Sequence, residues 1–142
     1  MDARMYFADA RWASKRLKDV ERLIDSGGDD WRPSKGKASV TPDPTGSEAL
    51  RRLSAVEDLV TERDALCAQI IEAAEVVHGV GRGLGSDHML VLGCYYLDCM
   101  KWEEVSEVLG LTVRRCIGLR DVALEWVDSV GFAHAKEGTG IA

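Results

Sequence analysis

Residues 102–127 read WEEVSEVLGLTVRRCIGLRDVALEWV, and this stretch decides the fold that we expect. Over residues 102–109, before Gly110, apolar residues recur on one face of a helix while glutamates occupy the other face. Gly110 can adopt the left-handed conformation that ends a helix in a sharp turn, and Thr112 can cap the helix that follows. The stretch therefore predicts two helices joined by a tight turn. The residues expected to face the core are Val105, Val108, Leu109, Cys116, Leu119, Ala123 and Val127.

A third helix is expected immediately before this pair. Ser86 or Asp87 can cap a short helix over residues 88–97. One face of that helix is apolar and can pack against the other two helices. We therefore predict a three-helix unit with helix-turn-helix geometry over residues 87–130. The apolar face consists of Met89, Leu92 and Tyr96.

The most basic helical surface lies at the start of the last of these helices. Residues 111–120 contain three arginines and no acidic residue. In a helix-turn-helix, the N-terminal turns of the second helix enter the major groove, where arginine can bind guanine edges or phosphates. We therefore predict that this surface binds double-stranded DNA. The candidate DNA-binding residues are Lys101, Thr112, Arg114, Arg115, Ile117, Gly118 and Arg120.

Some of these residues also have a purely structural interpretation. Arg114 and Arg115 could belong to an ordinary solvated helix face. Arg120 could pair with its neighbour Asp121, because ion pairs within exposed helices are common. Trp102 is expected to pack between helices rather than to contact DNA, since an indole at a helix start offers a large apolar surface. Those alternatives stay open on the sequence alone.

Two adjoining segments of this region resemble known DNA-binding proteins. Residues 92–112, LGCYYLDCMKWEEVSEVLGLT, are similar to the fourth-region helix-turn-helix of bacterial sigma factors. Residues 113–124, VRRCIGLRDVAL, resemble the end of the ArpU and RinA group of phage-encoded transcription regulators. The resemblance implies sequence-specific DNA binding by a phage or prophage protein, often an activator of late genes. It also implies a common order of parts: an N-terminal helix, a linker, a long helix and the DNA-binding unit.

The N-terminal part of the chain predicts two further helices. Apolar residues recur every three or four positions over residues 5–26 and again over residues 53–77. Residues 27–46 are rich in glycine, proline, serine and charge, which is typical of a flexible linker. The second apolar stripe is long and must pack against something. We therefore expect a helical hairpin within residues 1–79, or a coiled coil between chains, and either would suit a homo-oligomer.

Alternating glycines mark the end of the long helix. Residues 78–85 read HGVGRGLG, but no strand precedes them, as a dinucleotide-binding or phosphate-binding loop requires. We interpret residues 80–86 as a glycine hinge between the hairpin and the helix-turn-helix. The end of the chain, residues 131–142, is expected to be a flexible tail.

Composition and charge limit the classes of function. The chain has 142 residues, 46% of them apolar, and a net charge of −6. A protein that coats nucleic acid indiscriminately needs many basic groups, so this net charge argues against such a protein but does not exclude one that binds DNA through a local basic surface. The longest uncharged apolar stretch, residues 89–97, is far shorter than the roughly 20 residues that span a bilayer. With no signal-type apolar run at the N-terminus, we expect a protein of the bacterial host cytoplasm without membrane association.

No catalytic or metal site is expected. The four cysteines lie within apolar helical patterns without the short spacings typical of zinc sites, so we interpret them as reduced core thiols. Cys94, Cys99 and His88 are conceivable ligands, but a five-residue separation points the two thiols to different faces of a helix. The glutamates within residues 103–107 share one exposed face without an apolar pocket to raise a pKa. We therefore expect neither an enzyme nor a cofactor.

Taken together, the sequence predicts an all-α protein that consists of a long helical hairpin or coiled coil followed by a three-helix helix-turn-helix domain. With few basic groups it neutralises few phosphates, so we expect its affinity for DNA to depend on a homo-oligomer or on host RNA polymerase. Two other functions remain open. A DNA-packaging component such as a terminase small subunit also joins a helix-turn-helix to oligomerising helices. A protein-binding adaptor would use the three-helix unit without touching DNA.

Overall fold

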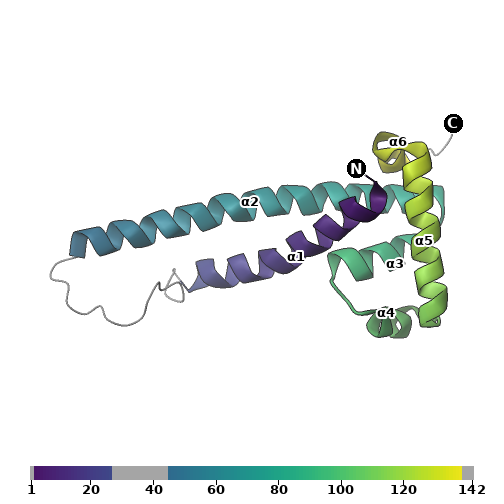
Figure 1. The fold of residues 1–142 in the computed structure, drawn as a ribbon, viewed down its shortest axis with the longest axis horizontal. Helices are drawn as coiled ribbons and strands as arrows, with labels where there is room; N and C mark the ends of the chain where they lie inside the picture. The colour runs from purple at the N-terminus through teal and green to yellow at the C-terminus, as the bar shows by residue number, and fades with distance from the viewer. Residues whose placement is uncertain (1, 27–44, 139–142) are drawn as a thin grey trace. The chain divides into compact units, whose positions relative to one another are not determined.

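The computed structural model describes residues 2–26 and 45–138, and every regular element within those ranges is helical. The prediction of an all-α fold is therefore confirmed. The linker expected over residues 27–46 lies outside the described residues, except that its last two positions already belong to a helix. In chain order the elements are α1 (Ala3–Asp25), α2 (Thr45–Gly83), α3 (Ser86–Leu92), the π-helix η1 (Gly93–Leu97), α4 (Trp102–Leu109), α5 (Val113–Val130) and α6 (Phe132–Glu137) (Figure 1).

The chain forms two compact units that do not follow the expected domain boundary. One unit comprises Met1–Lys15 together with Ala68–Ala142, and the other comprises Arg16–Cys67. The first half of α1 and the last four turns of α2 thus belong with the C-terminal helices rather than with a separate hairpin over residues 1–79. The physical reason is the apolar core that these segments share.

The larger core of the first unit joins α1 and α2 to the C-terminal helices. Its α1 residues recur at steps of four and three, which places them on one face of that helix. Phe7 is fully buried, and burial of such a side chain contributes about 1.5–3 kcal/mol to stability. The buried members are Ala3, Phe7, Ala10, Ala73, Val76, Val77, Val80, Leu92, Tyr96, Ala123, Leu124, Val127 and Ala135.

The glycines near the end of α2 serve close packing and do not form a hinge. Helix α2 continues through Gly83, which corrects the expectation of a glycine hinge over residues 80–86. A Cβ atom on Gly79 would lie 1.6 Å from the carbonyl oxygen of Ala135, and one on Gly83 would lie 2.5 Å from the ring of Trp126. Because these positions carry no side chain, α6 and α5 can approach α2 directly.

Helix α6 corrects the expectation of a flexible tail over residues 131–142. Residues 132–137 form this helix, which lies beside the C-terminal end of α2 in Figure 1. Ala135 is fully buried, and the guanidinium of Arg82 donates hydrogen bonds to the carbonyl oxygens of Lys136 and Glu137. Residues 139–142 lie outside the described residues.

The second unit contains the remainder of α1 and α2. Arg16 donates two hydrogen bonds to the Glu62 carboxylate, at 2.7 and 2.9 Å. These bonds hold the pKa of Glu62 below its ordinary value and raise the pKa of Arg16. The apolar stripe of α2 becomes buried only from Leu59 onward, since Leu53, which we expected on the same stripe, is 60% exposed.

The lengths and hydropathy of the helices bear on membrane association. Within residues 2–26 and 45–138, none of the helices combines the length and apolar character that crossing a membrane requires.

Candidate nucleic-acid interface

Helices α4 and α5 are joined by a three-residue turn that is fixed at both ends. Gly110 has a φ of 70°, and its N–H donates to the carbonyl of Ser106 at 2.9 Å. The Ser106 hydroxyl in turn donates to the carbonyl of Leu111. Thr112 caps α5, because its hydroxyl accepts a hydrogen bond from the backbone N–H of Arg115 at 3.1 Å. The sequence predicted the roles of Gly110 in the turn and of Thr112 as the cap, but not that of Ser106. The signal for it is a serine hydroxyl close enough in the chain, five positions before Leu111, to bind the backbone of the turn.

One small core holds this turn and the two helices together. Val105 of α4 and Cys116 of α5 are both fully buried in it, so the two helices pack as one unit. Val108 was expected to face inward and is 59% exposed, because the eight-residue α4 is covered on one side only. The buried members of this core are Val91, Cys94, Val105, Cys116 and Leu119.

The cysteines follow the prediction of core thiols in part. All four are free; Cys94 and Cys116 are buried, whereas the other two are half-buried. Burial raises the pKa of both buried thiols, which keeps them protonated and unreactive near neutral pH. Among the described residues, no group of three or more histidine, cysteine or acidic side chains is placed to hold a metal ion.

The start of α4 is organised by Glu104 and Trp102. The Glu104 carboxylate accepts a hydrogen bond from the backbone N–H of Lys101 at 2.8 Å, while the Lys101 side chain is exposed. The Trp102 ring stacks on Tyr95 with centroids 4.0 Å apart and an interplanar angle of 11°. The prediction that Trp102 packs between helices is therefore confirmed.

The N-terminal half of α5 presents an exposed basic surface. Arg114 and Arg115 are both exposed, and within the described ranges no side chain forms an ion pair or hydrogen bond with either guanidinium. Thr112 and Gly118 are exposed on the same part of the chain. Apart from its chain neighbours and the backbone of its own helix, a Cβ on Gly118 would meet no atom of the described residues within 4 Å. Ile117 is half-buried. We call Thr112, Arg114, Arg115 and Gly118 the recognition surface.

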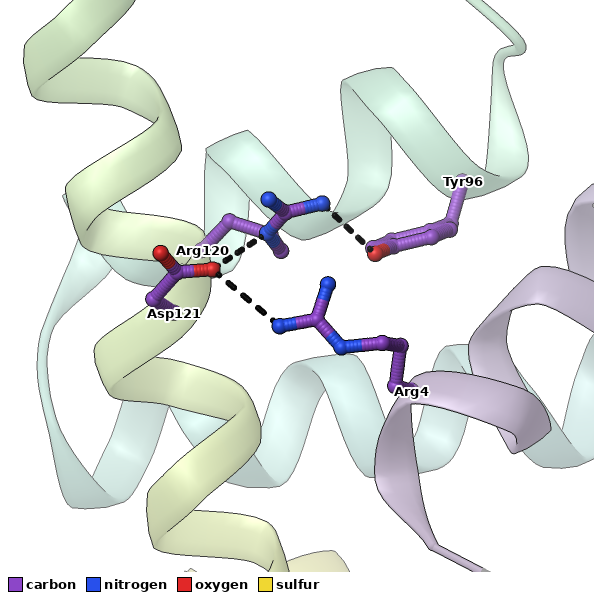
Figure 2. A network of polar contacts seen from close by, with 4 residues as sticks. All are labelled: Arg4, Tyr96, Arg120 and Asp121. Carbon is purple, nitrogen blue, oxygen red and sulfur yellow. Dashed lines mark hydrogen bonds and ion pairs between the residues drawn. The ribbon is translucent and has the colours of Figure 1, made fainter.

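Arg120 does not share this surface. Its Nε bonds to Asp121 at 2.8 Å and its Nη1 to the Tyr96 hydroxyl at 3.4 Å, as Figure 2 shows. The guanidinium also lies 5.3 Å from the ring centroid of Trp102, and only 15% of the side chain is exposed. The structure thus places Arg120 among packing partners, in agreement with the alternative that it pairs with Asp121.

Comparisons with known proteins give no independent assignment. The chain matches no protein-family model, no curated protein and no solved structure.

Proposed function

We propose that this protein binds double-stranded DNA in a sequence-specific manner and regulates transcription, with α5 as its recognition helix. The observation that carries the proposal is the combination of one shared core and one uncovered basic surface. Val105 and Cys116 fix α4 against α5, while Arg114 and Arg115 remain exposed at the second and third positions of α5. A helix-turn-helix places these same turns of its second helix in the major groove.

The chemistry of the recognition surface suits a duplex. Arginine side chains can bind both acceptors of a guanine edge or clamp a phosphate, and the uncapped amide groups of a helix N-terminus attract phosphate oxygens. Thr112 is engaged as a cap, so its role in DNA binding would be to position the helix. Gly118 would let the backbone approach the DNA closely, because it carries no side chain and none of the other helices of the described chain fills the space beside it.

The proposed biological setting is a phage or prophage, which the resemblance to phage regulators supports. Two exposed arginines neutralise few phosphates, so binding is expected to require a second copy of the chain on a repeated half-site, or contact with host RNA polymerase. Lys101 is proposed to contact a phosphate beside this surface, since it is exposed at the N-cap position immediately before α4.

Selection of bound fragments from a random DNA pool would identify the DNA sequence that the protein binds. A salt-dependent binding assay with that sequence would then test the proposed interface. Replacing Arg114 and Arg115 together by alanine should abolish retention at moderate salt. It should also reduce the slope of log K against log salt by about two, one for each lost phosphate contact.

The matched control replaces Arg51 and Arg52, an adjacent exposed pair on α2, by alanine. It changes the net charge equally and should leave binding unchanged. Equal binding by wild type and by the Arg114 and Arg115 double variant would refute the proposal and favour a protein-binding adaptor.

A further inference from the structure

A groove of about 390 Å³ lies between the first half of α1, η1 and α5, all within one compact unit. We call it the basic groove. Its α1 residues lie at positions 4, 8, 11, 12 and 15, a spacing that puts them on one face of the helix. Its volume is at the lower end of the range of small-molecule sites, about 300–1,000 Å³. Neither Arg114 nor Arg115 lines it, so it is separate from the recognition surface.

The groove concentrates positive charge in a chain that is negative as a whole. Four cations line it, and among the described residues that form its walls none is acidic. Asp121 lies at its edge, where it accepts from Arg120 at 2.8 Å and pairs with Arg4 at 3.6 Å (Figure 2). One carboxylate does not neutralise four cations, so the groove favours an anion. The four are Arg4, Arg11, Lys15 and Arg120.

Two of these cations are held in place before any ligand arrives. Arg11 donates to the carbonyl oxygens of Tyr95 and Met100, at 2.9 and 3.2 Å, and its guanidinium lies 4.3 Å from the Tyr95 ring centroid. Arg120 is fixed by Asp121 and Tyr96. Within the described residues nothing accepts from Nη1 of Arg11 or Nη2 of Arg120, so both retain donors for an oxyanion. Fixed arginines lose little entropy when they bind phosphate or carboxylate oxygens.

The remaining groups are exposed and able to close on a ligand. The Arg4 side chain is 62% exposed, and its one ion pair with another described residue is the contact with Asp121; Lys15 is exposed one helical turn beyond Arg11. Trp12 lies between Arg4 and Lys15 along α1 and is 60% exposed, although it is the largest apolar side chain on this face. An uncovered indole beside several cations suits a planar ring attached to an anion.

We propose that the basic groove binds a nucleotide unit, with its phosphate among the four cations and its base stacked on Trp12. The unit is supplied either by a free nucleotide or by an unpaired strand of nucleic acid, which present the same chemistry. An acidic peptide would use the cations but would leave the indole without a planar partner. The site is independent of the DNA-binding surface of α5, and either can fail without the other.

Calorimetric titration of the full chain at low salt, with AMP, adenosine and inorganic phosphate as separate probes, tests this assignment. AMP should bind at least about ten-fold more tightly than either of its parts, because only AMP engages both the cations and the indole. Trp12→Ala should weaken AMP binding about ten-fold, and Lys15→Ala should weaken it in a salt-dependent way. Lys18→Ala, an equal charge change on the same helix outside the groove, should have no effect.

Two further measurements distinguish a free nucleotide from an unpaired strand, and a nucleotide from an acidic peptide. A short oligodeoxythymidylate that binds with the same dependence on Trp12 would support the proposal and identify a strand as the source, whereas weaker binding than AMP would identify the free nucleotide. The double variant of Arg114 and Arg115 should bind AMP normally. The proposal is overturned if no saturable AMP binding occurs up to about 5 mM, if Trp12→Ala changes nothing, or if an oligoglutamate peptide binds more tightly than AMP through Lys15.

Discussion

Substitution of Gly118 by alanine separates the stability of α5 from its proposed contact with DNA. Gly118 lies within the regular helix Val113–Val130 and is exposed, and beyond its own helix backbone and chain neighbours none of the described residues has an atom within 4 Å of the position that a Cβ would take. Glycine in the interior of an exposed helix costs about 0.8–1.0 kcal/mol relative to alanine. Because no neighbour has to move, Gly118→Ala should recover that full amount.

The gain can be measured by urea denaturation followed by circular dichroism. A change of about 1 kcal/mol in the free energy of unfolding corresponds to a rise of roughly 3–5 °C in melting temperature for a chain of this size. Gly79→Ala is the control of opposite sign, because its Cβ would overlap the carbonyl oxygen of Ala135 at 1.6 Å. Overpacking of this kind costs about 1–3 kcal/mol or more, which exceeds the gain in helix propensity.

The same variant should bind the selected duplex more weakly than wild type although it is more stable. Its added methyl group stands on the recognition surface, where the backbone is proposed to approach the DNA. Loss of stability in Gly118→Ala would refute the description of this position as an open helical site. Unchanged DNA affinity in the more stable protein would refute close backbone approach at Gly118.

Three further outcomes are expected. Because the pKa of Glu62 is lowered in the folded protein, its ion pair with Arg16 stabilises the fold above the ordinary carboxyl pKa of about 4.3, and this stabilisation is lost as the pH falls through the lower pKa of the folded state. Glu62→Gln should therefore flatten the dependence of the urea midpoint on pH between neutral and acid conditions, and an unchanged profile would contradict the pairing. Cys94 and Cys116 should react with a thiol reagent more slowly than the two half-buried cysteines, because burial raises their pKa values, and labelling followed by mass spectrometry would reveal the reverse order if it occurred. Trp102→Ala should lower the free energy of unfolding by about 2–4 kcal/mol by removing the stack on Tyr95, and a loss well below 1 kcal/mol in chemical denaturation would count against that packing.

The turn between α4 and α5 could be predicted closely from the sequence because its signals are local. Gly110 at the turn and Thr112 at the cap each act on backbone groups within three or four positions. Cys116 and Leu119 were also assigned correctly to the core, since apolar spacing within one helix determines which residues share a face.

The packing of α2 could not be predicted in the same way. The role of Gly79 depends on Ala135, which is more than fifty positions away in the chain, and nothing local distinguishes a packing glycine from a hinge glycine. In α1 the periodic pattern fits Tyr6 and Phe7 equally well, and only the direction from which α2 and α5 approach decides that Phe7 is the buried one. The position of the Arg120 side chain likewise depends on its hydrogen bond to Tyr96, a residue of another helix.

Residue-resolved NMR of the selected duplex titrated into the labelled protein tests the proposed DNA-binding surface most directly. The largest shifts should fall on the amides of residues 112–118 and on the side-chain Nε–H groups of Arg114 and Arg115, with smaller changes at Lys101. Shifts concentrated elsewhere, for example around Trp12, or an unperturbed α5 at saturating duplex, would contradict the assignment of α5 as the recognition helix.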